Sequence, residues 1–375
     1  MMLYLLVTAV TIGLAYQIRQ TENHNFRTKT LTRRQGFGTL CLLAIFCVLF
    51  LLSALRLEVG NDYGTYVDTI HEIYVGGYVV TEPLFNAIVK FLCLLSGGEN
   101  YLLVFAVFGA LTIALYLKVL YEQSENFPLA FFLFMTLGIY FRTFNTVRFY
   151  LALAITMYAY RFVLKKQYVK FVLLIGLTAF LHKSVLVVIP LYWIARQKWK
   201  KWQMACLGVL AIAVAFGRGL VMEVALRLYP SYVDTIYLEQ GTGFLANAMS
   251  LGRCIVVLLA ALLCYKNYIA GDEELEFYFR LNILAILLYT CASYLPLVGR
   301  IGYYLTTSHI LLLPALVNRI TEEKKRKWAM VVLIVLALLY FALFLKTGNQ
   351  EGVRILPYKS WLFYEKDFLN AGEIF

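Results

Sequence analysis

Long apolar runs separated by short polar loops dominate the 375-residue chain. Strands of a membrane barrel alternate apolar and polar residues in units of about ten, whereas these runs are continuous and mostly long enough for helices that cross a ~30 Å hydrocarbon layer. The fold class predicted is therefore an all-α polytopic membrane protein, one integral-membrane domain over residues 1–375. We predict spans at about 2–18, 38–55, 101–121, 127–141, 148–164, 203–220, 247–265, 280–298, 301–317 and 328–346.

Two segments do not fit a simple alternation of spans. The apolar helix at 83–97 would be only about 22 Å long, so we predict a re-entrant or in-plane helix. A single span at 171–195 would put the basic stretch after Arg196 on the outside, whereas two half-length helices folding back at His182–Lys183 would keep it inside. We favour the broken pair over a single tilted span. The total is then about twelve transmembrane helices plus short re-entrant or in-plane helices.

The net charge of +12 comes largely from basic clusters in loops. Lys and Arg accumulate in cytoplasmic loops of membrane proteins, so this charge indicates topology rather than binding to nucleic acid. The resulting map predicts external loops at about 56–83, 142–148 and 221–246 and an external tail at 347–375. The clusters lie within 27–34, 165–170, 196–201 and 324–327.

Several arginines then fall on the predicted outer side, against the positive-inside bias. Each could simply reach the lipid headgroups. The alternative is a diphosphate clamp, because a guanidinium holds phosphate oxygens bidentately and stays charged when partly desolvated. The candidate diphosphate-binding residues are Arg56, Arg142, Arg148 and Arg300, with Lys183 adding positive charge.

His182 and Asp62 are the candidate catalytic residues. His182 is either a buried imidazole bonded to a neighbouring helix or the general base for an acceptor hydroxyl. Asp62 either caps a following helix or orients or deprotonates a sugar hydroxyl. His309 lies in a predicted span without partners, and the histidines suggest no metal site. No Walker or Rossmann pattern is present, so no cofactor is expected.

An ordered set of short motifs resembles the EpsG-like branch of the Wzy polysaccharide polymerases. Asn145 to Arg148 forms N-x-x-R, but Phe149 stands where that family often has Gln. The other matching motifs are R-x-x-x-G-x-D-Y-x-x-Y at 56–66, E-P-L-F at 82–85, a K-rich loop at 165–170, A-F-L-H-K-S at 179–184, R-x-G-Y-Y at 300–304 and P-Y-K-S at 357–360.

The resemblance implies a C-type glycosyltransferase of the bacterial cytoplasmic (inner) membrane that needs no metal. Such enzymes join undecaprenyl-diphosphate-linked oligosaccharide repeat units on the outer face, with the lipid diphosphate as leaving group. Its partners would be these lipid-linked glycans, membrane lipids and a chain-length regulator protein, with no nucleic acid. Two alternatives stay open: a lipid-linked oligosaccharide flippase or transporter, which usually shows repeated halves, and an O-antigen ligase, which shares the donor.

Overall fold

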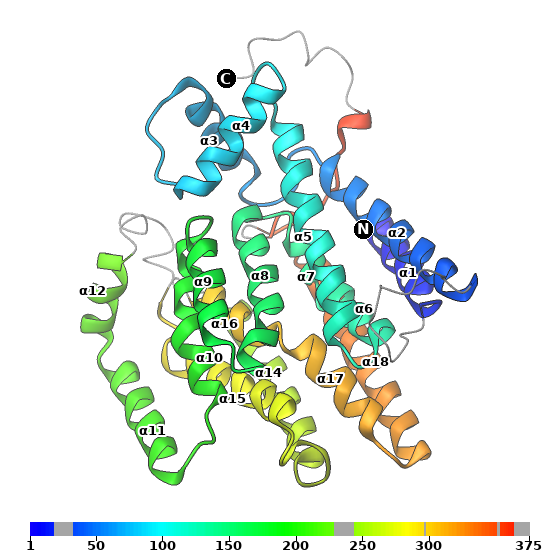
Figure 1. Cartoon of the computed structure of the whole chain (residues 1–375), viewed down its shortest axis with the longest axis vertical. Coiled ribbons are helices and arrows are strands. Elements are labelled where there is room, and N and C mark those ends of the chain that lie inside the picture. The colour runs from blue at the N-terminus through cyan, green and yellow to red at the C-terminus, as the bar shows by residue number, and fades with distance from the viewer. Residues whose placement is uncertain (19–32, 229–243, 296–297, 351–352, 364–375) are drawn as a thin grey trace. The chain divides into compact units, whose positions relative to one another are not determined.

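The computed structural model describes residues 1–18, 33–228, 244–295, 298–350 and 353–363 (Figure 1). Every regular element in these ranges is a helix, and one isolated antiparallel bridge joins Arg56 to Ser360. The predicted all-helical class is therefore confirmed. The chain divides into two compact units, Met1–Ala154 with Lys327–Phe375 (unit 1) and Ile155–Arg326 (unit 2). Each unit is described by itself.

Five helices in the described part are long and apolar enough to cross a membrane, and a bent sixth passes if its two halves are counted together. The predicted total of about twelve also includes shorter apolar helices, so that total stays a prediction. The five are Gln35–Ala54, Tyr101–Gln123, Val147–Leu164, Ala246–Ile269 and Glu323–Lys346, and the bent pair is Lys201–Phe216 with Arg218–Arg227.

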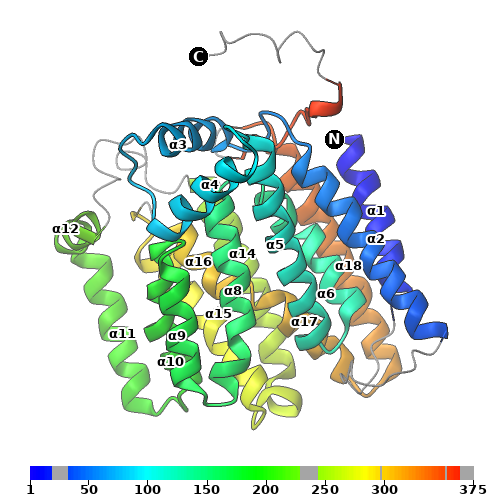
Figure 2. The same ribbon diagram turned by 45° about the horizontal axis from the view of Figure 1, so that its top comes forward.

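In unit 1, helix α2 packs against α5 and α1, and α1 packs against α6 (Figure 2). The predicted span at 127–141 is interrupted at Gly138, whose φ of 72° ends α6 and starts α7. The helices are α1 (Met2–Tyr16), α2 (Arg33–Ala54), α3 (Tyr63–Val75), α4 (Pro83–Leu95), α5 (Tyr101–Gln123), α6 (Phe127–Thr136), α7 (Ile139–Arg142), the first half of α8 (Val147–Leu164) and most of α18 (Glu323–Lys346).

Two short helices, α3 and α4, lie at one end of this unit. Helix α3 occupies part of the predicted external loop at 56–83 and runs across the direction of α5 (Figure 2). It buries one face, which includes Tyr66 and Ile70, and ends at Gly76 in the left-handed conformation. Helix α4 has 13 residues, about 20 Å, so it is as short as the sequence predicts.

Unit 2 contains α9 (Tyr168–Ala179), the 3-10 turn η1 (Lys183–Val187) and α10 (Val188–Arg196) in place of one continuous helix. The predicted interruption near His182 is thus confirmed. The other helices are the second half of α8, α11 (Lys201–Phe216), α12 (Arg218–Leu228), α14 (Phe244–Cys264) with the π-turn η3 (Tyr265–Ile269), α15 (Glu273–Cys291), α16 (Val298–Thr306) and α17 (His309–Arg319).

Two predicted spans of unit 2 are not continuous helices. The span at 203–220 bends by 86° at Gly217, between α11 and α12. The span at 301–317 is interrupted at Thr307–Ser308, where both hydroxyls donate to backbone carbonyls of the preceding turn. Such local hydrogen bonds compete with helix continuation. Gly299 and Arg300, which separate two predicted spans, lie in α16.

Most of the acidic stretch at 271–280, which lies between two predicted spans, forms the first turns of α15. Asp272 is the N-cap, and its carboxylate accepts from the backbone N–H groups of Glu274 and Leu275 at 3.0 and 2.9 Å. Three glutamates follow in the first turn, where the helix dipole favours negative charge. An Asp followed by several glutamates is a pattern typical of a helix N-terminus, and it is visible in the sequence.

Candidate functional site

Arg148, in the first turn of α8, is the centre of the most developed polar site in unit 1. Its Nη1 forms an ion pair with Glu82, and its Nε donates to the Tyr66 hydroxyl at 3.3 Å. The side chains of Arg148 and Glu82 are 16% and 11% exposed. The guanidinium is therefore held in place and remains partly exposed.

Two aromatic rings support the guanidinium of Arg148. Its carbon lies 5.0 Å from the centre of the Phe85 ring and 5.7 Å from that of Tyr66, within cation–π range. Burial raises the pKa of Tyr66, and Arg148 opposes this shift, so the phenol keeps its proton at neutral pH. The phenol accepts from Arg148 and retains a hydrogen to donate.

Asp62 lies beside this site but does not cap α3 with its side chain. Its carboxylate instead accepts from the Thr146 hydroxyl and, at 3.4 Å, from the Asn61 amide. The Asn61 backbone N–H donates to the Asn145 side chain at 3.0 Å. The two motifs at 56–66 and 145–148 are therefore joined directly, which the sequence could not show.

Arg56 occupies a different environment from Arg148. It is 1% exposed, its Nη1 donates to Ser53 at the C-terminus of α2, and its guanidinium carbon lies 4.6 Å from the Phe105 ring centre. Its Nε and Nη2 have no hydrogen-bond partner among the described residues. Burial lowers its pKa to about 10, against smaller raising effects of nearby tyrosines, so it remains charged at pH 7. At 1% exposure, the side chain of Arg56 is enclosed by protein and does not extend to the lipid headgroups.

The P-Y-K-S motif at 357–360 packs beside Arg56, at the C-terminus of α2. The Leu57 N–H donates to the Lys359 carbonyl at 3.0 Å, and the Tyr358 hydroxyl donates to the Leu52 carbonyl at 3.0 Å. The Tyr4 hydroxyl, from α1, donates to the Ile355 carbonyl at 2.6 Å. The tail is therefore connected by hydrogen bonds both to α1 and to the C-terminus of α2.

His182 lies in unit 2 at the break before η1, in extended backbone and 5% exposed. Two residues later, Ser184 Oγ is 2.9 Å from the Tyr304 hydroxyl, and the Tyr192 hydroxyl donates to the Tyr304 carbonyl at 2.7 Å. The A-F-L-H-K-S and R-x-G-Y-Y motifs thus meet in this unit.

The remaining predicted site residues divide between the units. Arg142 is in unit 1, where its guanidinium carbon lies 4.8 Å from the Phe344 ring centre of α18. Lys183 and Arg300 are in unit 2, in η1 and α16, and both are partly exposed. Within their own units, Asp62 lies beside Arg148, and the loop of His182 and Lys183 packs on the helix of Arg300.

Sequence reasoning missed several polar partners. Glu82, Tyr66 and Thr146 complete the surroundings of Arg148 and Asp62. His309 is not without a partner, because its Nε2 is 2.8 Å from Asn282 Oδ1 in the core of unit 2. Tyr66 and Glu82 stand in motifs of the sequence, which was the available signal, but the residues that they contact lie far away in sequence.

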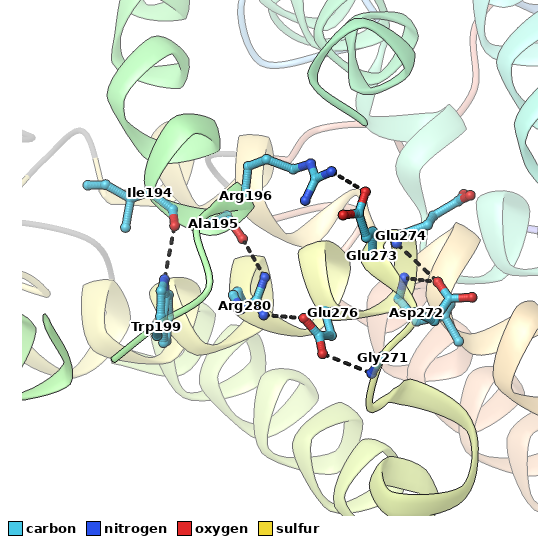
Figure 3. Close-up of polar contacts among 11 residues, drawn as sticks. Ile194, Ala195, Arg196, Trp199, Gly271, Asp272, Glu273, Glu274, Glu276 and Arg280 are labelled. Carbon is cyan, nitrogen blue, oxygen red and sulfur yellow. Dashed lines mark hydrogen bonds and ion pairs between the residues drawn. The ribbon is translucent and has the colours of Figure 1, made fainter. Parts of the chain in front are cut away.

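A charged clamp joins α10 to α15 in unit 2 (Figure 3). Arg196 pairs with Glu273, and Arg280 pairs with Glu276 while donating to the Ala195 carbonyl at 3.3 Å. Arg196, through its hydrogen bond and charge, lowers the pKa of Glu273, with Lys166 adding to the shift. The charges compensate one another, which indicates a structural role.

No group of three or more His, Cys, Asp or Glu side chains that could hold a metal ion occurs among the described residues. The site in unit 1 instead offers a positioned guanidinium, a phenol and two carboxylates. Such a set can bind a phosphate oxygen and accept a proton.

The chain matches the model of the EpsG family over residues 39–360. No curated protein and no solved structure matches the chain. The matched range includes every motif named above, from Arg56 in unit 1 through Tyr304 in unit 2 to Ser360 in the tail. The chain therefore belongs to the EpsG family.

Proposed function

We propose that this membrane protein is a polysaccharide polymerase that joins undecaprenyl-diphosphate-linked oligosaccharide repeat units on the outer face of the bacterial cytoplasmic membrane. The observation that carries the proposal is the arrangement around Arg148 in a chain of the EpsG family. A guanidinium at the first turn of a candidate span suits a lipid diphosphate at the edge of the hydrocarbon layer.

In the proposed reaction, the bond between the anomeric carbon of the growing glycan and its lipid diphosphate breaks. The acceptor hydroxyl, at the non-reducing end of the incoming unit, forms the new glycosidic bond and gives its proton to a base. Arg148 stabilises the charge that develops on the departing diphosphate. His182 is our first candidate for the base and Asp62 the second.

The other arginines have different parts in this proposal. Arg56, almost fully buried and bonded to Ser53 at the end of α2, is proposed to fix the start of the loop that carries Asp62. Arg300 and Lys183, which are partly exposed in unit 2, are proposed to contact the diphosphate of a bound substrate. Arg142 packs on Phe344 and supports the turn before α8.

The test uses natural substrate. A strain lacking this protein should accumulate its lipid-linked repeat unit on the outer side, whereas accumulation inside would indicate a flippase. Purified full-length protein in lipid nanodiscs, given this unit and a chelator, should produce a glycan ladder. A single transfer to a different lipid acceptor would instead indicate a ligase.

Arg148→Ala should lower ladder formation by about 100-fold or more, as removal of a transition-state donor does. The matched control is Arg227→Ala, because Arg227 is an exposed arginine paired with Glu223 on its own helix. A properly folded Arg148→Ala protein that still made full-length polymer would contradict the proposed site. His182→Ala and Asp62→Asn, compared in the same assay, identify the base.

A further inference from the structure

Glu82 has an unusual position for its chemistry. It is the N-cap residue of α4, where Ser, Thr, Asp or Asn usually bonds to the first backbone N–H groups. Its carboxylate makes no such bond, and Pro83 follows at the first helical position without an N–H. The carboxylate is instead directed to Arg148.

The ion pair between Glu82 and Arg148 occupies the guanidinium that the proposed function assigns to the diphosphate. Nη1 is bonded to Glu82 and Nε to Tyr66. A phosphate that binds Arg148 through Nη1 therefore has to share this nitrogen with a carboxylate of the same sign of charge, or displace that carboxylate. Both side chains are mostly buried, so water screens this competition less than it would at the surface.

We infer that Glu82 is a positioning residue and an intramolecular competitor of the lipid diphosphate. In the empty site it holds the Arg148 guanidinium over Phe85, and on binding it yields Nη1 to a phosphate oxygen. When the glycan has been transferred, Glu82 takes Nη1 back and promotes departure of the undecaprenyl diphosphate. This inference rests on the proposed function, because it assumes that Arg148 binds that group.

The test measures equilibrium binding of undecaprenyl diphosphate, the product, to the full-length protein in nanodiscs. Glu82→Gln keeps the shape but removes the competing charge, so we expect roughly tenfold tighter binding. In turnover, the same variant should show a lower KM and a lower kcat because product leaves more slowly. Glu82→Asp, which keeps the charge, should stay closer to the wild type.

Two further variants make the result specific. Glu99→Gln removes a carboxylate of the same unit that pairs with His71 rather than with Arg148, and should bind as the wild type does. The double variant Glu82→Gln with Arg148→Ala should bind no more tightly than Arg148→Ala alone, because the competition acts through Arg148.

The outcomes separate this inference from the proposed function. Equal or weaker binding by a folded Glu82→Gln protein, with Arg148→Ala still losing affinity, would overturn the role of Glu82 and leave the diphosphate site standing. Wild-type binding that Arg148→Ala does not weaken would overturn the diphosphate site itself, and the role of Glu82 with it. A lower melting temperature of Glu82→Gln without tighter binding would assign Glu82 a purely structural part.

Discussion

At the scale of single residues, Arg148 and Arg56 belong to the same set of motifs but lie in different chemical environments. Arg148 is partly exposed and paired with a carboxylate, whereas Arg56 is enclosed by aromatic rings at the end of α2. In sequence both look like arginines at the outer end of a span. Burial and partners, which depend on distant residues such as Glu82 and Phe105, separate their roles.

Replacing Arg148 with lysine tests whether geometry matters beyond charge. Lysine is a point charge and cannot bond to Glu82, Tyr66 and a phosphate with a planar fork. We expect a loss of polymerisation of at least about tenfold. The measurement is the rate of ladder formation, with Arg227→Lys as control. Activity close to wild type would show that positive charge alone is sufficient.

Gly60 is the position in the unit 1 site where a side chain is least tolerated. Its φ is 107°, and an added Cβ would lie 2.2 Å from the carbonyl oxygen of Phe144. We expect Gly60→Ala to destabilise the protein by about 1–3 kcal/mol through backbone strain alone. Thermal unfolding in detergent measures this.

The control for Gly60→Ala is Gly64→Ala in the first turn of α3, where nothing lies within 4 Å of the added Cβ. Alanine there should be neutral or stabilise by up to about 1 kcal/mol, because it favours the helix more than glycine. Equal melting temperatures of both variants would contradict the close approach of Gly60 to Phe144.

At the scale of elements, the clamp between α10 and α15 should make stability depend on pH. The folded-state pKa of Glu273 is lowered from its ordinary value of 4.5, chiefly by Arg196. A lowered carboxyl pKa contributes stability that is present above the unfolded-state pKa and is lost as the pH falls through the folded-state value.

Glu273→Gln should therefore lower the melting temperature at pH 7, because it leaves Arg196, whose side chain is 5% exposed, without this charge partner. The difference from wild type should vanish as the pH falls well below 4.5. Glu223→Gln, which breaks an exposed pair with Arg227, should change little at any pH. A difference independent of pH would indicate that packing, not charge, connects α10 to α15.

At the scale of the whole molecule, the tail joins parts of unit 1 that lie far apart in sequence. Tyr4 in α1 and Leu52 in α2 both bond to the stretch from Ile355 to Tyr358. The site at Arg148 is held by α3, α4 and α8, and the tail in turn bonds to the loop that leads into α3, since the Gly60 N–H donates to the Arg354 carbonyl at 2.8 Å.

Tyr4→Phe should destabilise unit 1 by about 0.5–1.5 kcal/mol, because it removes one buried hydrogen bond and leaves the Ile355 carbonyl without this donor. Polymerising activity should fall in parallel with stability rather than independently of it. Tyr78→Phe is the control, since Tyr78 is 88% exposed. Unfolding temperatures and ladder rates measured together on the two variants decide the result.

The sequence alone determined the features that follow from composition and local pattern. Apolar runs indicated helices and a membrane, a short run at 83–97 indicated α4, and the costly His182–Lys183 pair indicated a break between α9 and α10. The ordered motifs indicated the EpsG family. These features can be predicted because the length of an apolar run, its hydropathy and a charge within it can each be read from a short stretch of sequence.

Only the tertiary structure decided which polar residues meet. It joined Arg148 to Glu82, Asp62 to Thr146, and Ser184 to Tyr304, pairs separated by 66, 84 and 120 positions in the chain. It also showed that the helices of two predicted spans are interrupted, one at Gly217 and the other at Thr307–Ser308. Ion pairs and side-chain hydrogen bonds depend on distance in space, which hydrophobic periodicity does not specify.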